Sequence, residues 1–524
     1  MMGCILAATL FSSCKKSAFV EDNINPNTLY TVKPEDQFLA ATTGIINDFE
    51  AYYDNYRRIM FWMQMSTDTR GNRKNFTKDA SNFNHRYGTF YGNVAPKLAD
   101  IAQLIKAMPT ASQGAYVYEQ SISDILMAYY AFYVSDINGS IPYTEAFQAR
   151  YGGSLTPKYD KQSDLFTTLD KQLKDAVTAL KTTPAAGQKS YGVNDLFFSG
   201  DVTKWIKAGN AVRLLMAMRM MKVDAARMIA IVTEVLSNPA DLMASNNDSW
   251  VYVTPGSTAG SGGNWNPVGF RAPKPSLDFM VAKADPRLRL FYFPNLQGNY
   301  VGSWTSPDSA TKYVDIYAKG DTIISHLQYR MFDATAPDKS GNPGIGGNNY
   351  YPLITYAQIC LMRAELAARS ITTESAATWY TIGVTASINF YDAQGKAANV
   401  EGYTAVIPSE IAAYLAMPDI AYNPAKGVDQ ITSQAYLDFY KNPNEAWALY
   451  KRTGNPNPAS VLTLPVMTSD GAVIVIPRRA PLGLFDPTSP NADNRKAAYD
   501  QMTTDPGFGT DPNDAFGRVW WDKP

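Results

Sequence analysis

Cysteine and histidine are both scarce in this sequence. Of its 524 residues, three are cysteine and two are histidine. Cys4 and Cys14 lie in the first fourteen residues and Cys360 stands alone, so the body of the chain cannot build a disulfide framework. His85 and His326 have no second histidine, cysteine or carboxylate at metal-ligand spacing. This excludes a histidine-based zinc site, and we interpret both histidines as structural.

The sequence also lacks an excess of charge and any long polar tract. Its 47 basic and 48 acidic residues are mixed along the chain, and the formal net charge is −1. A nucleic-acid-binding protein would show a basic surface, so nucleic acid is not an expected partner. What the sequence has in quantity is aromatic residues, with 33 tyrosines, 23 phenylalanines and nine tryptophans. Aromatic rings suit both a core and a ligand platform.

The N-terminus carries a short apolar run followed by a cysteine. Residues 5–11 (ILAATLF) precede Ser12, Ser13 and Cys14. A span of the bilayer needs about 20 apolar residues, so this run is too short to cross a membrane. Small residues before a cysteine resemble a lipoprotein signal, which predicts lipid attachment at Cys14. The alternative is an ordinary apolar helix start, which would need a periodic polar face.

Helical periodicity begins in the first third of the chain. Apolar residues recur every three or four positions in 121–135, which predicts one buried stripe. Ser163 can cap a second helix, whose apolar stripe runs over 166–180. Asp201 begins a third, in which Gly209 would allow close contact with a neighbouring helix. These helices are predicted to stack as amphipathic hairpins.

The middle of the chain has a different character. Residues 246–351 contain Gly and Pro clusters and scattered aromatics, which predicts a loop-rich region with short strands. Helical patterns return at 356–369, where Thr355 is the expected cap, and at 430–440 and 445–453. The last of these is expected to end at Gly454. The helical pairs are expected to be degenerate tetratricopeptide-like units.

Several spaced segments together resemble the SusD/RagB family of outer-membrane nutrient-binding lipoproteins from Bacteroidetes. Five sets of residues carry the resemblance, in the family's order: 136–143 (DINGSIPY); 200–205 (GDVTKW) with 211–219 (AVRLLMAMR); 285–288 (DPRL); 356–359 (YAQI) with 363–367 (RAELA); and Gln434 with 445–456 (EAWALYKRTGNP), 476–479 (IPRR) and Asn491. Residues 480–485 depart from the family pattern, which has a Tyr-Pro pair after the arginines.

The resemblance implies a mainly α fold, in which a tetratricopeptide-like scaffold of helical hairpins carries a loop-rich ligand-binding part. It also implies a partner, a SusC-like TonB-dependent transporter of the outer membrane. We therefore expect a signal peptide at 1–13, a tether at 14–33 and a single domain at 34–524. The protein is expected to be lipid-anchored in the outer membrane and to face the cell exterior.

Catalytic motifs are not evident in the sequence. The glycine clusters at 256–263 and 341–347 do not match the phosphate-binding pattern that ends in Gly-Lys-Ser/Thr. A glycosidase needs two carboxylates about 5 to 9.5 Å apart, which a sequence neither establishes nor excludes. We expect a binding protein without a catalytic residue, cofactor or metal. A lipid-anchored glycan hydrolase is the alternative from another class.

Two aromatic and polar regions are candidates for ligand binding, because sugar rings present apolar faces that stack on aromatic side chains. In the first region the predicted contacts are Arg73, Asn75 and Phe76. In the second they are Trp250, Trp265, Asn266, Tyr300 and Trp304. Trp304 is the first choice as a ligand contact, because the residues around it are polar and favour turns. The alternative for each ring is that it only fastens its own loop to the scaffold.

Two further tryptophans, Trp205 and Trp447, are predicted to lie in the core. The leading hypothesis is capture of a glycan and its delivery to the transporter. A peptide is the alternative ligand within the same family.

Overall fold

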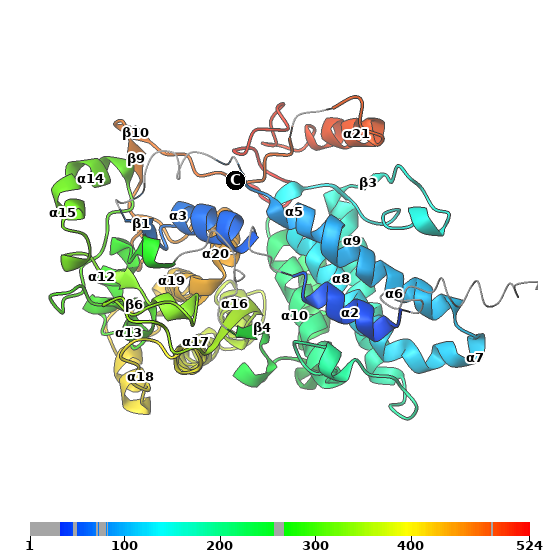
Figure 1. Ribbon diagram of the computed structural model, residues 1–524, viewed down its shortest axis with the longest axis horizontal. Helices are drawn as coiled ribbons and strands as arrows, with labels where there is room; N and C mark the ends of the chain where they lie inside the picture. Colours follow the sequence, from blue (N-terminus) through cyan, green and yellow to red (C-terminus); the bar gives the residue numbers. More distant parts are fainter. Residues whose placement is uncertain are drawn as a thin grey trace, which may run out of the picture.

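The computed structural model describes residues 32–45, 50–69, 72, 80, 82–255, 267–483 and 486–524. Cys14, and with it the predicted signal peptide, lies outside the described residues. The fold is mainly helical, as predicted, with short strands between the helices (Figure 1). Within the described part of the chain, helices that are both long and apolar enough to cross a membrane do not occur.

Four pairs of helices form the scaffold, and each pair packs along its length. In chain order they are α2 (Pro34–Thr42) with α6 (Ala95–Ala107), α8 (Val117–Asn138) with α9 (Gln162–Thr182), α10 (Val202–Met220) with α11 (Ala225–Leu236), and α16 (Tyr356–Ala368) with α17 (Ala376–Ala397). Short links join α10 to α11 and α16 to α17, so these pairs are hairpins. This arrangement agrees with the predicted tetratricopeptide-like scaffold.

The predicted helices are found, with one correction at a cap. Asp201 caps α10 through the Lys204 amide, and Thr355 caps α16 through the Gln358 amide. Ser163 was expected to cap α9, but the helix begins at Gln162, so Ser163 lies in its first turn. The side chain of Gln162 is buried and donates to the Ser135 carbonyl at 2.6 Å, which fixes the helix start two residues earlier than predicted.

Glycine at two predicted positions has a clear steric role. A Cβ added at Gly209 would come within 2.7 Å of Val177 Cγ2, so the close approach of α10 to α9 needs a glycine there. Gly454 follows α20 (Pro443–Thr453) with φ +76°, a left-handed conformation in which it ends the helix.

The predicted loop-rich middle leaves and rejoins the scaffold through one antiparallel ribbon. β4 (Trp250–Pro255) pairs with β8 (Asn348–Ile354), which leads directly into α16. The segment between them supplies three strands of a four-stranded sheet, and the fourth, β1 (Thr67–Asp68), comes from the N-terminal part of the chain. The order in the sheet is β1, β5 (Phe270–Arg271), β7 (His326–Leu327) and β6 (Tyr292–Phe293). Short helices surround it: α12 (Lys274–Ala282), α13 (Leu288–Phe291), α14 (Pro307–Lys312) and α15 (Val314–Ala318).

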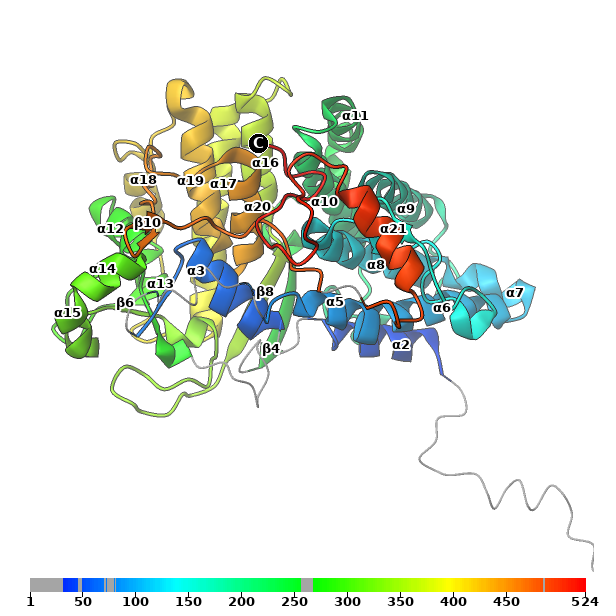
Figure 2. The ribbon, with the colours of Figure 1, turned by 90° about the horizontal axis from the view of Figure 1, so that it is seen from above.

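The remaining elements complete two halves that lie side by side (Figures 1 and 2). One half holds α2 and α5 to α11, and the other holds α3 and α12 to α20. The further elements are η1 (Glu50–Ile59), α3 (Met60–Trp62), α5 (His85–Thr89), η2 (Phe90–Val94), α7 (Thr110–Gln113), β2 (Ile141–Pro142), β3 (Tyr159–Asp160), α18 (Pro408–Leu415), α19 (Gly427–Asp438), β9 (Thr468–Ser469), β10 (Ala472–Val473) and α21 (Ala492–Met502).

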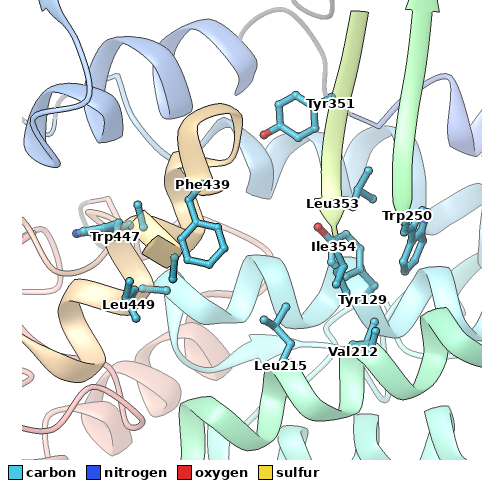
Figure 3. Packing of buried hydrophobic residues seen from close by; sticks show 14 of the residues in the cluster. Tyr129, Val212, Leu215, Trp250, Tyr351, Leu353, Ile354, Phe439, Trp447 and Leu449 are labelled. Atoms are coloured by element: carbon cyan, nitrogen blue, oxygen red, sulfur yellow. The ribbon is translucent and has the colours of Figure 1, made fainter. Parts of the chain in front are cut away.

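One aromatic core connects the halves. Trp205 and Trp447 are fully buried, as predicted. Figure 3 shows the core running from Tyr129 and Trp250 past the end of β8 to Phe439 and Trp447.

Buried charges join the segments that resemble the SusD/RagB family. Arg219 pairs with Asp136 at 2.9 Å and with Glu445 at 2.7 Å, and Gln358 donates to Glu445 at 3.1 Å. These four side chains come from four of the family-like segments, and all are buried. A buried charge is tolerated only when it is paired and hydrogen-bonded, so the segments depend on one another.

A second buried charge, that of Arg287, is also paired and hydrogen-bonded. Arg287 donates to Asp285 at 2.7 Å, to Gln434 at 2.8 Å and to Ser387 at 3.0 Å. Both members of the Asp285–Arg287 pair are almost inaccessible to solvent. The family-like motifs therefore hold the scaffold together.

Candidate ligand-binding surface

Trp304 forms a half-buried aromatic stack on the loop-rich part of the protein. Its ring lies 4.1 Å from the ring of Tyr313, with 21° between their planes. Tyr317 meets Trp304 edge-on, at 6.1 Å and 71°. Tyr313 lies between α14 and α15 and Tyr317 lies on α15, while Trp304 is in the segment before α14. The three rings form part of a small cluster that is separate from the main core.

Hydrogen bonds hold the backbone of Trp304 in place. The Trp304 amide donates to the Tyr317 hydroxyl at 3.0 Å. The preceding Ser303 Oγ is 3.0 Å from the same hydroxyl and accepts from Thr67 Oγ1 at 2.6 Å. Burial raises the pKa of Tyr317, so its hydroxyl stays protonated over the physiological range. The Trp304 side chain is thus fixed before any ligand arrives.

Charged groups flank the stack. The Lys312 ammonium lies 5.2 Å from the centre of the Tyr313 ring. On the other side of α14, Asp308 accepts from the backbone amides of Asp470 and Gly471, at 2.7 and 3.0 Å. Hydrogen bonds from Thr468 and from these amides lower the pKa of Asp308. The ionised carboxylate therefore fastens the turn between β9 and β10 next to the stack.

The sheet pairs the strand that precedes the first predicted binding region with a strand from the second. β1 and β5 are antiparallel, with Asp68 opposite Phe270 and Thr67 opposite Arg271. The chain therefore leaves β1 and enters β5 at the same end of the pair. Arg73, Asn75 and Phe76 follow β1, whereas Trp265 and Asn266 precede β5. All five lie outside the described residues, so their contacts with a ligand stay predictions.

Trp250 was predicted to contact ligand, and the structure contradicts this. Its side chain has no exposed surface. The ring packs 4.9 Å from Tyr129 and 5.1 Å from Trp205 (Figure 3). The physical reason is the β4–β8 pairing, because Trp250 lies opposite Ile354 where the ribbon enters the helical core. Trp250 is therefore a core residue.

Tyr300 does not join the Trp304 stack. It is half-buried against the main core, and burial raises its pKa while Arg289 opposes this effect. Its role in ligand binding stays a prediction. Tyr313 and Tyr317 were not predicted as site residues, and the structure places both against Trp304. Their spacing of four residues is helical and could have indicated a shared face.

Both histidines make close contacts within the protein. His85 Nδ1 lies 2.9 Å from the buried Asp54 carboxylate, and its ring stacks on Tyr53 at 5.3 Å. His326 is almost completely buried, and its ring stacks on Phe293 at 5.2 Å.

The sequence matches one family model over residues 26–480, that of the SusD-like proteins, described as starch-binding and associating with the outer membrane. The match covers most of the chain, so the protein belongs to the SusD-like family. This confirms the resemblance found in the sequence. The family is one of substrate-binding proteins, not of enzymes. No curated protein is a significant match to the sequence.

Solved structures with the same fold cover 94% of this chain. One is a chitin-binding protein with 23% sequence identity, a TM-score of 0.75 and 100% of its own chain covered. Another is a chitin-binding SusD homologue from Flavobacterium johnsoniae, with 19% identity, a TM-score of 0.69 and 98% coverage. A SusD homologue from Parabacteroides distasonis has 20% identity, a TM-score of 0.70 and 98% coverage. At these identities the likeness shows the fold alone.

Proposed function

We propose that the protein captures a glycan on the surface that contains the Trp304–Tyr313 stack and delivers it to a SusC-like TonB-dependent transporter. The half-buried Trp304 ring, held against Tyr313, is the observation that carries the proposal. The description of the family as starch-binding supports a glycan as the ligand class. Two structural relatives named as chitin-binding proteins point to the same class.

The geometry of the stack suits a sugar. An aromatic face offers a flat apolar surface to the C–H groups of a pyranose, and nearby polar groups add direction. Because the Trp304 backbone and ring are already fixed, binding would order few additional side chains. Less ordering on binding leaves more of the contact energy as affinity.

The proposal includes a location. The family associates with the outer membrane, and a lipid on Cys14 would hold this protein there, facing the cell exterior. In this account residues 1–13 are the signal peptide, 14–33 the tether and 34–524 the single binding domain.

Binding and turnover measurements on the full mature chain test the proposal. Calorimetric titration with maltoheptaose, chitohexaose and a tryptic peptide mixture would compare the ligand classes, and chromatography of the same mixtures would detect products. We expect a glycan to bind and to be recovered unchanged. Binding of peptides alone, or appearance of shortened glycans, would contradict the proposal. Co-purification of a TonB-dependent transporter from outer membranes tests the delivery step.

A further inference from the structure

A groove of about 490 Å³ lies on the helical scaffold, and its described lining shares no residue with the cluster around Trp304. It is bounded by α17, by the first residue of α16 and by the short turn η7 (Asn246–Asp248), which precedes β4. α16 and α17 pack along each other (Figure 1), and both contact η7. Small-molecule sites commonly have volumes of about 300 to 1,000 Å³, so the groove has room for a short oligosaccharide.

Two hydrogen bonds fix the walls of the groove. The Asn246 side-chain amide donates to the Ala386 carbonyl at 2.9 Å, which joins η7 to α17. The Tyr356 backbone amide donates to Ser249 Oγ at 2.9 Å, which joins the start of α16 to the end of η7. The groove is therefore formed before any ligand arrives.

The lining of the groove is neutral. Within the described part of the chain it contains no charged side chain. The carboxylate of η7 belongs to Asp248, which is buried and accepts from Lys207 Nζ at 2.9 Å and from the Ala244 amide at 2.8 Å. Its charge is thus paired within the protein. A charged ligand group would lose its hydration in the groove without gaining a partner of opposite charge, so the matching ligand is neutral.

Three polar side chains of the groove are accessible and make no hydrogen bond to any other described residue. They are the amides of Asn247 and Asn389, which are exposed, and the hydroxyl of Thr385, which is half-buried. Thr385 and Asn389 are four residues apart on α17, so they lie on one face of the helix. Amide and hydroxyl groups both donate and accept, which matches the hydroxyl groups of a sugar.

Apolar side chains complete the lining, namely Tyr356, Ile382, Ala386 and Ala244. Tyr356 is half-buried and packs against the main core, which holds its ring in place. Burial raises the pKa of Tyr356, so its hydroxyl stays protonated and neutral. A ligand that fits the groove combines an apolar face with several hydroxyl groups and carries no charge. A neutral pyranose unit has these features.

We propose that this groove is a second carbohydrate site, which takes a neutral sugar unit against Tyr356 with Asn247, Thr385 and Asn389 as its hydrogen-bond partners. The site offers one aromatic ring among its described residues, whereas Trp304 is stacked on Tyr313. Its affinity is therefore expected to be lower than that of the Trp304 surface. The groove uses no residue of that surface and does not depend on the function proposed for it.

Calorimetric titration of the full mature chain carrying Trp304→Ala tests the groove without the first surface. We expect a neutral trisaccharide, maltotriose or chitotriose, to bind. Trigalacturonate carries three carboxylates and should bind at least about tenfold more weakly, because its charges find no partner in the groove. Absence of neutral-sugar binding would overturn the proposal and leave the function proposed for Trp304 intact. Binding of trigalacturonate as tight as that of the neutral sugars would also overturn it.

A double variant in the same background locates the site. Asn247→Ala/Asn389→Ala removes both exposed amides. We expect neutral-sugar binding to weaken by about tenfold or more, since each neutral hydrogen bond is worth roughly two- to tenfold in affinity. Asn513→Ala, which removes an exposed amide outside the groove, is the matched control and should bind as its parent does. Unchanged binding in the double variant would overturn the assignment.

The same double variant in a chain that retains Trp304 separates the two proposals. It should keep the tighter binding at the Trp304 surface and lose only the weaker binding at the groove. Loss of the tighter binding would overturn the assignment of the groove as an independent site.

Discussion

Arg219 and Glu445 form a buried ion pair, with 2.7 Å between Nη2 and Oε1, that joins α10 to α20. The same guanidinium binds Asp136 at the end of α8. Burial of Arg219 would favour its neutral form, but Asp136 and Glu445 outweigh this effect and raise its pKa. The pair therefore stays charged and connects the two halves of the scaffold across their contact.

We expect Glu445→Gln to destabilise the protein by about 3 to 5 kcal/mol, because it leaves part of the Arg219 charge buried without its partner. Chemical denaturation followed by circular dichroism would measure the loss in the free energy of unfolding. Lys171→Gln is the matched control, since it breaks the exposed ion pair with Asp175 on α9. That change should cost less than about 1 kcal/mol. Equal effects of the two substitutions would contradict this role for the buried pair.

Lys451 predicts a pH dependence of stability. Burial lowers its pKa to about 7 from an ordinary value of 10.5. Between these two values the unfolded chain binds a proton that the folded protein does not, so the contribution of Lys451 to stability increases as pH rises from about 7 toward 10.5.

The variant Lys451→Met isolates this contribution. We expect it to be more stable than the wild type near pH 7, with a difference that shrinks as the pH approaches 10. Denaturation at a series of pH values would measure this difference. A difference that stays constant with pH would show that Lys451 is not the group responsible. Lys441 is also buried, and its pKa is also lowered to about 7. Its contribution is the same in the wild type and in Lys451→Met, so the difference between the two proteins reports Lys451.

Trp250 is a core residue, so its removal should affect stability and not ligand binding. We expect Trp250→Ala to lower the free energy of unfolding by about 3 to 5 kcal/mol, as for other large buried aromatic residues. The affinity of the folded fraction for glycan should not change. Loss of affinity without loss of stability would restore Trp250 as a ligand contact.

Cys14 carries the proposed lipid. We expect Cys14→Ala to move the protein from the membrane fraction to the soluble fraction, because a lipid anchor is lost. Cys4→Ala is the matched control and should leave the protein in the membrane fraction. Fractionation of cells followed by immunoblotting would measure both. Unchanged partitioning of Cys14→Ala would contradict lipid attachment at that residue.

The scaffold could be predicted from the sequence because its signals are local. Residues 121–135 repeat apolar side chains at helical spacing, and the caps Asp201 and Thr355 act on amides three residues away. The start of α9 was missed by two residues because Gln162 is positioned by a contact with Ser135, across 27 residues of sequence. A contact between residues this far apart leaves no pattern in the sequence around Gln162.

The candidate surface was predicted only in part for the same reason. The polar, turn-rich neighbours of Trp304 were visible in the sequence, whereas its stack with Tyr313 depends on how α14 folds back. Trp250 has a similar loop-like sequence context, but pairing with a strand about 100 residues later buries it. Exposure of an aromatic residue is set by tertiary contacts, which the sequence pattern does not contain.

The contribution of Trp304 to ligand capture is measured by the affinity of Trp304→Ala for the glycan that the wild type binds best. Trp379→Ala is the matched control, because Trp379 is also half-buried but lies on α17. Calorimetric titration with maltoheptaose or chitohexaose should show at least about tenfold weaker binding for Trp304→Ala, a loss of about 1.4 kcal/mol, because the sugar loses the aromatic face on which it packs. Trp304→Phe should retain part of the affinity, and Trp379→Ala all of it. Wild-type affinity in a correctly folded Trp304→Ala variant would contradict the account.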